Sequence, residues 1–334
     1  MIVSRTPYRI SLFGGGTDFP QWYMENGGAV IGTTINKYCY LSLRRLPPFF
    51  EHRHRIVYSK IELTNSISEI EHPSVKAVLD NHWKGEGLEV HHQGDLPARS
   101  GLGSSSSFTV GLLNAVKALK GEMAGSEWLA NEAIRIEQDV IGESVGSQDQ
   151  VWAAYGGTNL IKFEVGGKIN VQPLIITKKT LRKVNDHLLL FFTGFSRLAV
   201  EIESEKMANI HRLHAHLDKM KSLVFDAQNI FKGQDGGIGD LGGMLNYAWE
   251  LKKQLSGSVS SSAIDEIYCE GLAAGATGGK LLGAGGGGFM LFFAPPERHE
   301  AIRRRLNKLI EVGFEIGSCG SKIVVYEPNG LDHV

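Results

Sequence analysis

The feature that most constrains this chain is the way its glycines are grouped. The sequence has 41 glycines among 334 residues, with clusters at Gly14–Gly16, Gly101–Gly103, Gly233–Gly243 and Gly275–Gly288. Glycine allows positive φ and close approach of the main chain, so a cluster marks a place where backbone must come near another group. A fold for this chain must therefore accommodate several such close approaches.

Between the clusters the hydrophobic period changes repeatedly. Ile2–Phe13 and Ala29–Arg44 alternate as strands do, whereas Ser105–Lys120 and Ser126–Ile141 have apolar residues three and four apart, as in helices. This mixture predicts an α+β fold. The later elements that we expect are a hairpin of Asn159–Val165 and Lys168–Leu174 around Gly166-Gly167, helices over Ser196–Phe231, Leu245–Leu255 and Glu297–Val312, and a strand over Ser321–Tyr326.

Composition narrows the classes of partner. The 35 basic and 36 acidic side chains nearly cancel, which argues against nucleic acid or an anionic membrane and favours a small ligand. The three cysteines lie far apart without a CxxC spacing, which suits a reduced cytoplasm and leaves oxygen ligands for any metal. The sequence shows no signal peptide and no run of membrane-spanning length. We therefore expect a cytoplasmic protein that could form a homodimer.

The middle glycine cluster has the composition of an anion site. The run from Asp95 to Gly111 reads DLPARSGLGSSSSFTVG and leads directly into a helical pattern. Glycines can turn N–H groups inward, serines can cap the helix, and the helix dipole favours negative charge at that end. A capped helix after a flexible linker is the alternative interpretation.

Two other nucleotide-binding patterns do not fit. The loop lacks the lysine of GxxxxGK[ST], which disfavours a P-loop NTPase. The run Gly283–Gly288 contains GxGxxG, but an apolar strand pattern follows it where a dinucleotide site needs a helix. We interpret this run as a tight turn between strands, with or without direct ligand contact.

Two carboxylates could carry out phosphoryl chemistry near such a loop. Glu137 lies on a predicted helix and could hold Mg²⁺, and Asp149 lies in a predicted glycine-flanked loop and could orient or deprotonate a hydroxyl. At the N-terminus Arg9 precedes a glycine turn that we expect to present Thr17 and Asp18 outward. Asp18 could accept hydrogen bonds from sugar hydroxyls, and Arg9 could pair with Asp149. The alternative is that these are solvated acids, a turn aspartate and a surface arginine.

Taken together, TPYRISLFGGGTD, LPARSGLGSSSSFTVG and GGKLLGAGGGGFMLFF resemble, in order, the three signature motifs of the GHMP kinases. The resemblance implies a two-lobed α+β fold, with a lobe like ribosomal protein S5 domain 2 over residues 1–180 and a ferredoxin-like lobe over 181–334. The lobe boundary is expected near Thr177–Asp186.

The resemblance also implies roles. Asp149 matches the catalytic aspartate and Arg9 the basic residue that interacts with it; ATP is the phosphoryl donor, and Ser105 with Glu137 holds Mg²⁺. The ATP phosphates are expected on Gly101, Leu102, Gly103, Ser104, Ser105, Ser106 and Ser107, and the substrate on Gly15, Gly16, Thr17, Asp18, Arg197, Lys280 and Gly286.

The GGGTD form of the first motif departs from the Gly-Glu-His-Thr-Asp of galactokinases and resembles the heptose kinase and fucokinase branch. LLLFFTGFSRLA and WELKKQLSGSVSSSAIDEIY look most like bacterial D-glycero-D-manno-heptose phosphate kinases, which act on the anomeric hydroxyl of heptose 7-phosphate. A phosphorylated substrate needs a cationic clamp, for which we expect Arg197, with Arg44, Arg45 or Lys280 as alternatives. An unphosphorylated sugar such as L-fucose, or a non-catalytic sensor role, are the alternative functions.

Overall fold

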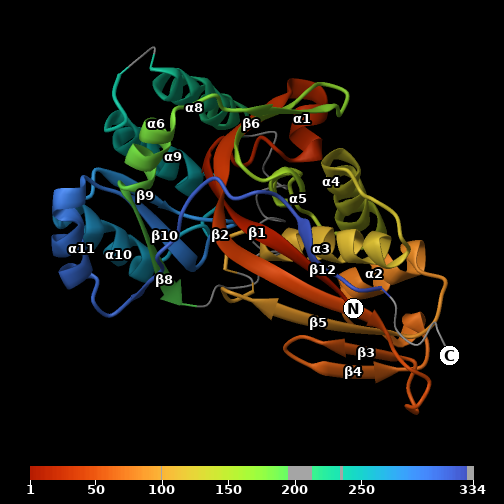
Figure 1. Ribbon diagram of the computed structural model, residues 1–334. Coiled ribbons are helices and arrows are strands. Elements are labelled where there is room, and N and C mark those ends of the chain that lie inside the picture. Colours follow the sequence, from red (N-terminus) through yellow and green to blue (C-terminus); the bar gives the residue numbers. More distant parts are fainter. Residues whose placement is uncertain (99, 195–212, 234–235, 329–334) are drawn as a thin grey trace.

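A computed structural model describes residues 1–98, 100–194, 213–233 and 236–328. Its helices and strands are arranged around two β-sheets (Figure 1). The described helices include none that is long and apolar enough to cross a membrane.

The larger sheet has eight strands and is built on two long, adjacent strands, β1 and β2. They pair antiparallel in a register that sets Arg9 opposite Thr34 and Ser11 opposite Gly32. The sheet order is β12-β1-β2-β5-β3-β4, and the hairpin of β6 and β7 adds to the first half of β2. The strands are β1 (Ile2–Phe13), β2 (Gly28–Arg45), β3 (His54–Val57), β4 (Ile61–Thr64), β5 (Leu88–Gly94), β6 (Thr158–Phe163), β7 (Ile169–Pro173) and β12 (Lys322–Tyr326).

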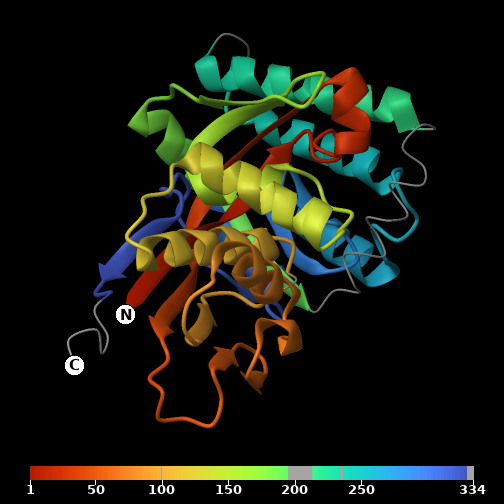
Figure 2. The same cartoon turned by 90° about the vertical axis from the view of Figure 1, so that its right-hand side faces the viewer.

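Helices cover one face of this sheet as two layers (Figures 1 and 2). Helix α3 packs on both β1 and β2, α5 packs on β1, and α2 and α4 lie against α3. Helix α4 continues into a π-helical turn, Ile136–Val140, which carries Glu137. The helices of this part are α1 (Pro20–Asn26), α2 (Pro73–His82), α3 (Ser104–Leu119), α4 (Ser126–Arg135) and α5 (Gln148–Tyr155), with a 3-10 turn at Ile67–Glu69.

The smaller sheet has four strands in the order β11-β8-β10-β9 and lies beside α9, α10 and α11 (Figure 1). Helix α8 reaches from this part of the molecule to pack on β1 and β2. The elements are α6 (Lys178–Asn185), β8 (Leu188–Gly194), α8 (His214–Lys232), α9 (Asp240–Lys253), α10 (Ser262–Ala273), β9 (Gly278–Leu281), β10 (Gly288–Phe293), a 3-10 turn at Pro296–Arg298, α11 (His299–Arg305) and β11 (Ile310–Glu311).

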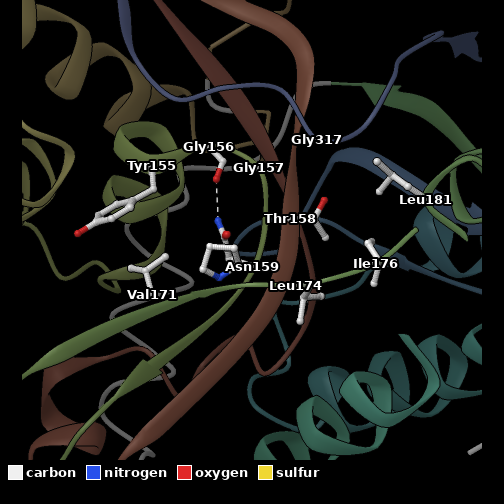
Figure 3. A pocket seen from close by; sticks show the side chains of 11 residues that line it. Tyr155, Gly156, Gly157, Thr158, Asn159, Val171, Leu174, Ile176, Leu181 and Gly317 are labelled. Carbon is white, nitrogen blue, oxygen red and sulfur yellow. Dashed lines mark hydrogen bonds between the residues drawn. The ribbon is translucent and has the colours of Figure 1, made fainter. Parts of the chain in front are cut away.

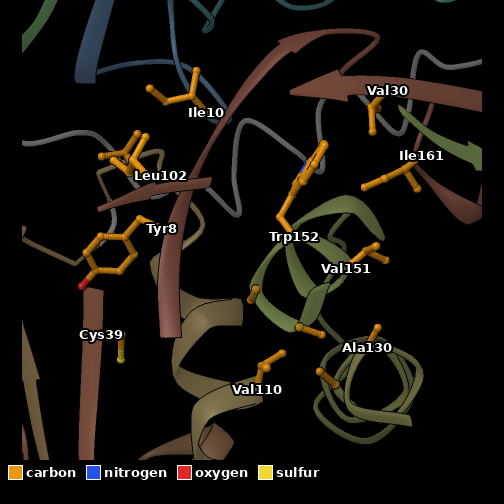
Figure 4. Close-up of a cluster of buried hydrophobic side chains, with 14 of the residues drawn as sticks. Tyr8, Ile10, Val30, Cys39, Leu102, Val110, Ala130, Val151, Trp152 and Ile161 are labelled. Carbon is orange, nitrogen blue, oxygen red and sulfur yellow. The ribbon is translucent and has the colours of Figure 1, made fainter. Parts of the chain in front are cut away.

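The core that supports the site lies between the large sheet and its helices (Figure 4). Its labelled members include Tyr8 and Ile10 of β1, Val110 of α3 and the fully buried Trp152 of α5. Burying a tryptophan side chain contributes several kcal/mol, and its loss typically costs about 3–5 kcal/mol. This packing fixes the orientation of α5, and hence of Asp149 in the first turn of α5.

Most of the predicted elements are present, with two corrections and one helix that is only partly described. The helix expected over Glu297–Val312 ends at Arg305, because Ile310 and Glu311 instead pair with the edge of β8. Asp149 lies in the first turn of a helix and not in a loop. The helix expected over Ser196–Phe231 is described only from His214, and its earlier part lies outside the described residues.

The two-lobed α+β architecture is confirmed, while a division at residue 180 stays a prediction. The four-stranded sheet is formed entirely within residues 188–311. The last strand, β12, returns to the large sheet and pairs with β1. The chain thus passes from the large sheet to the smaller sheet and returns to the large sheet with β12.

Candidate active site

The loop before α3 has the geometry of an anion-binding turn. Gly101 and Gly103 have φ of 82° and 75°, a left-handed conformation that favours glycine, and Gly103 caps the helix that begins at Ser104. The N–H groups in the first turn of a helix have no acceptor within that helix and carry its positive dipole end. The predicted phosphate loop is therefore shaped to receive negative charge.

Arg9 fixes this loop to strand β1 and also binds Asp149. Its backbone N–H donates to the Leu102 carbonyl at 3.0 Å, and its Nη1 donates to the Gly101 carbonyl at 2.6 Å. Its Nε and Nη2 donate to the two oxygens of Asp149, each at 2.7 Å. The expected pairing of Arg9 with Asp149 is present, as a bidentate ion pair between side chains that are 7% and 24% exposed.

The ion pair lies directly against the loop. A Cβ placed on Gly103 would lie 3.2 Å from Cγ of Arg9 and 3.4 Å from Oδ2 of Asp149. A hydroxyl held by Asp149 would therefore be close to an anion held by the loop. Transfer of a group from that anion to the hydroxyl requires the two to be close together.

The third glycine cluster supports the loop from the other side. A Cβ on Gly283 would lie 2.3 Å from Cα of Gly101, and one on Gly288 would lie 2.3 Å from the Ser100 carbonyl oxygen. Gly283–Gly288 forms the turn between β9 and β10, as expected from the sequence. Two distant glycine clusters thus meet backbone to backbone, an approach that side chains would prevent.

Glu137 lies behind the loop and is 1% exposed. Its Oε2 accepts hydrogen bonds from Ser106 Oγ at 2.9 Å and from Gln150 Nε2. The pKa of Glu137 is raised to about 7, mainly by burial and in part by the charge of Glu143, although the side chains of Thr109, Ser106 and Gln150 act to lower it. Its Oε1 has no hydrogen-bond partner among the described residues.

These residues fit a magnesium ion. A buried carboxylate oxygen without a partner, beside a serine hydroxyl, is a hard-oxygen donor set that a cation would satisfy. Within the described residues no three His, Cys, Asp or Glu side chains cluster as metal ligands, so further ligands would be phosphate oxygens and water. The serine bonded to Glu137 is Ser106, whereas the expected Ser105 is exposed.

The first glycine cluster holds Asp18 in an unexpected orientation. Thr17 and Asp18 are 0% and 2% exposed, so the expectation that they face outward is wrong. The Thr17 hydroxyl donates to the Gly14 carbonyl and accepts from the Ala29 N–H, which ties the turn to β2. Asp18 accepts from the Gly16 N–H at 2.9 Å; burial, aided by the charge of Asp149, raises its pKa.

Three of the residues predicted to bind a substrate phosphate do not have positions suited to that role. Lys280 is buried and donates to the carbonyls of Ser11 and Leu12, joining β9 to β1, so its ammonium is a link between the two parts of the chain. Arg44 and Arg45 lie at least ten positions beyond Thr34 along β2, roughly 30 Å from Arg9. That distance excludes them from a site beside Asp149.

Four further residues were predicted to bind the substrate: Gly15, Gly16, Arg197 and Gly286. The N–H of Gly286 donates to the Val259 carbonyl at 2.9 Å and thereby holds the turn. Arg197 lies outside the described residues. Gly15 and Gly16 lie in the first turn as predicted, and a Cβ on Gly16 would contact Leu217 of α8 at 3.3 Å.

Sequence reasoning did not select Ser11, Gln148 or Gln150. The two glutamines flank Asp149, and Gln150 binds Glu137 directly. The signal was a run of polar residues next to a buried tryptophan in one short helix, but a polar residue at a helix start is usually solvated. Only the packing of α5 against β1 shows that these side chains point inward.

A separate cavity of 480 Å³ lies at the other end of α5 (Figure 3). Its lining is mainly apolar and includes Val171, Leu174 and Ile176, together with Gly156 and Gly157. Helix α5 is about 12 Å long, so this cavity is distinct from the site around Asp149 at the start of the helix.

A glycine-rich turn at a helix start, a buried carboxylate behind it and an Arg–Asp pair beside it define a site suited to moving a phosphoryl group onto a hydroxyl. Residues 70–157 match the model of the GHMP kinase N-terminal domain, and residues 227–312 match that of the GHMP kinase C-terminal domain. Together the two matches cover more than half of the chain, which therefore belongs to the GHMP kinase family of ATP-dependent phosphotransferases.

Relatives within the family include kinases of sugars. The chain is 29% identical to a D-glycero-alpha-D-manno-heptose 7-phosphate kinase of Campylobacter jejuni, over 92% of this chain and 93% of that protein. It is 25% identical to a bifunctional fucokinase/GDP-fucose pyrophosphorylase of Arabidopsis thaliana, over 93% of this chain but 31% of that protein. A solved structure described as a D-glycero-D-manno-heptose 1-phosphate kinase of Bacteroides thetaiotaomicron superposes with a TM-score of 0.79 at 26% identity, covering 98% of this chain and 100% of that one. The chain is thus similar to sugar kinases across nearly its whole length.

Proposed function

We propose that this protein transfers the terminal phosphoryl group of ATP to the anomeric hydroxyl of D-glycero-D-manno-heptose 7-phosphate. The product is the 1,7-bisphosphate, a precursor of nucleotide-activated heptose. The similarity to the Campylobacter jejuni kinase over nearly the full length of both chains supports this substrate. The observation that carries the chemistry is the Arg9–Asp149 pair in contact with Gly103 of the phosphate loop.

In the proposed mechanism, Gly101–Ser107 binds the ATP phosphates through N–H groups and hydroxyls at the start of α3. Asp149 accepts the hydrogen bond of the attacking hydroxyl and directs its oxygen toward the phosphorus in line with the leaving group. Arg9 holds both oxygens of Asp149 in place and contributes positive charge near the transferred group. Glu137 and Ser106 would hold Mg²⁺, which neutralises negative charge on the phosphates when bound.

Because the loop, the ion pair and Glu137 are held by buried contacts before any ligand arrives, most of the rate is expected to come from positioning and electrostatics. The 7-phosphate of the acceptor needs a cation, and Arg197 is the residue that we propose for it. An Arg197→Ala variant should raise the KM for heptose 7-phosphate and leave the KM for ATP unchanged. An unchanged KM for the sugar phosphate would remove Arg197 from the site.

The experiment that tests the substrate is ADP release with Mg²⁺ and ATP across a panel of acceptors. The panel contains heptose 7-phosphate, heptose 1-phosphate, unphosphorylated heptose, L-fucose, D-mannose and D-galactose. Turnover confined to heptose 7-phosphate is the expected result. Turnover of heptose 1-phosphate alone would place the transfer at the other end of the same sugar, in line with the description of the Bacteroides thetaiotaomicron structure.

A kinase of a free sugar is the second candidate, and the similarity to the Arabidopsis thaliana fucokinase favours it. Preference for L-fucose or another free sugar would keep the fold and the Asp149 mechanism but overturn the phosphate clamp. Absence of ADP release with every acceptor would overturn the proposed function and favour a sensor role.

A further inference from the structure

The polar side chains of Ser11, Gln148 and Asp18 lie around Gly15, close to the Arg9–Asp149 pair, and we call this group of side chains the recess. Gly15 carries no side chain, and a Cβ placed on it would lie 3.7 Å from Ser11 Oγ and 3.7 Å from Gln148 Nε2. These are ordinary contact distances, so the space above Gly15 is bounded by two polar groups. Neither group took part in the mechanism described above.

Ser11 faces the same side of β1 as Arg9. The two residues are two positions apart in a stretch of regular pairing with β2, where Arg9 lies opposite Thr34 and Ser11 opposite Gly32. Side chains at i and i+2 of a strand point to the same face, roughly 7 Å apart. The Ser11 hydroxyl thus projects toward the site that the Arg9 guanidinium forms with Asp149.

Gln148 reaches the recess from the opposite element. It precedes Asp149 in the first turn of α5, and its side chain lies close enough to the Asp18 carboxylate to lower the pKa of Asp18. Asp18 is itself positioned by the Gly16 N–H at 2.9 Å. The recess therefore contains a hydroxyl from β1, an amide from α5 and a carboxylate from the first glycine turn.

Two polar atoms in this recess lack partners. Ser11 and Gln148 are each 8% exposed, and neither Ser11 Oγ nor Gln148 Oε1 has a hydrogen-bond partner among the described residues. A buried polar atom without a partner is costly, and such atoms are expected where a ligand supplies the missing bond. Adjacent hydroxyls of a polyol, each able to donate and accept, match this arrangement of groups.

We propose that Ser11 and Gln148, beside the Asp18 already expected to bind the sugar, bind the acceptor hydroxyls that neighbour the reacting one and thereby decide which sugar is phosphorylated. This inference rests on the proposed sugar-kinase function and adds the specificity of the same site. Discrimination is expected to be strong, because a sugar that lacks the hydroxyl leaves buried polar groups unpaired.

The first test is Ser11→Ala, measured with the sugar that wild-type protein phosphorylates most efficiently. The KM for that sugar should rise about 3- to 10-fold, the effect of losing one neutral hydrogen bond, with the KM for ATP unchanged. Thermal stability should stay the same or increase, since the deleted hydroxyl has no described partner. Ser4→Ala is the matched control, because Ser4 Oγ is also buried and unpartnered on β1 but lies roughly 23 Å from Ser11.

Two further variants and a set of analogues make the test independent of one substitution. Gln148→Met keeps the length of the side chain, and Gly15→Ala adds a methyl group within the recess; each should raise the KM for the sugar about tenfold or more. At least one deoxy analogue, lacking the hydroxyl that Ser11 binds, should give the same KM with wild type and Ser11→Ala. Unchanged KM values in all three variants would overturn the proposal. So would a Ser11→Ala variant whose KM is raised over that of wild type by the same factor with every deoxy analogue.

Failure of the recess can be told apart from failure of the proposed function. The acceptor panel with wild-type protein tests the function first, and the variants are then measured with whichever sugar is used. If no sugar supports turnover, calorimetric binding of heptose 7-phosphate with a non-hydrolysable ATP analogue replaces KM. Weaker binding to Ser11→Ala would support the recess without catalysis, whereas absent binding to wild type, or equal affinity for wild type and variant, would overturn it.

Discussion

Asp149 and Glu137 both lie against the same glycine-rich loop, in contrasting surroundings. The side chain of Asp149 is 24% exposed, and Arg9 binds both of its oxygens. Glu137 is almost fully buried, and its neighbours are hydroxyls and an amide that leave one oxygen without a described partner. One carboxylate is oriented by a cation of the protein, while the other has an oxygen that a bound cation would satisfy.

This difference separates the two tasks of the proposed reaction. A carboxylate fixed by a guanidinium can hold a hydroxyl at a defined place, and a buried carboxylate whose pKa is about 7 can bind a metal when it loses its proton. The contrast predicts that substitutions of the two acids will fail in different ways.

The largest effect is expected from Asp149→Asn. The amide keeps the size of the side chain but has only one acceptor oxygen for both Arg9 and the attacking hydroxyl, so turnover should fall roughly 10²–10⁴-fold. Calorimetric affinity for ATP should remain nearly that of wild type, since the loop is also held by Arg9 through Gly101 and Leu102. Full activity in this variant would remove Asp149 from the proposed mechanism.

Glu137→Gln should change how stability depends on pH in the absence of metal. Between about pH 4.5 and pH 7 the folded protein keeps a proton on Glu137 that the unfolded chain loses, because burial raises the pKa of Glu137 to about 7 from 4.5. The unfolded state binds fewer protons in this range, so the free energy of unfolding of the wild-type protein should fall as pH rises, by on the order of 3 kcal/mol. Glu137→Gln has no carboxyl group at this position and should not show this part of the fall.

Denaturant unfolding at several pH values measures this effect. Asp18 also has a raised pKa and contributes with the same sign in both proteins, so the difference between wild type and Glu137→Gln isolates Glu137. Equal pH dependence in the two proteins would contradict the burial argument. Activity of the variant should also require more Mg²⁺.

A smaller effect distinguishes the two serines near Glu137. Ser106 donates to the Glu137 carboxylate, so Ser106→Ala should raise the Mg²⁺ concentration for half-maximal activity about tenfold. Ser105 is exposed, and Ser105→Ala serves as the matched control with a smaller change expected. A larger change at Ser105 would show that the hydroxyl at that position reaches the metal when ATP is bound.

Prediction from sequence succeeded where a local pattern and a physical requirement coincide. Strand β1 has the predicted bounds, and α3 begins within one residue of its expected start, because the period of apolar residues and the glycine–serine boundary are both local signals. The pairing of Arg9 with Asp149 followed from complementary charge and the family resemblance. The substrate itself stays a proposal.

Prediction failed where burial decides. Thr17 and Asp18 belong to a turn that looks exposed by sequence, yet α8 and β2 cover it, and a threonine hydroxyl can satisfy backbone groups as readily as it can meet solvent. Lys280 has the composition of an anion clamp, but its ammonium meets two carbonyls of β1. The sequence around a lysine does not indicate which carbonyl groups of a distant strand will lie next to its ammonium group in the folded protein.

The sequence by itself determined the element types and the three glycine clusters, because backbone conformations with positive φ and hydrophobic periods are properties of neighbouring residues. Tertiary structure alone decided that Gly283 meets Gly101, that Ser106 rather than Ser105 binds Glu137, and that Ser11 and Gln148 share a recess over Gly15. These contacts join residues far apart in the chain. Their geometry depends on how α3 and α5 pack on β1, which no local pattern encodes.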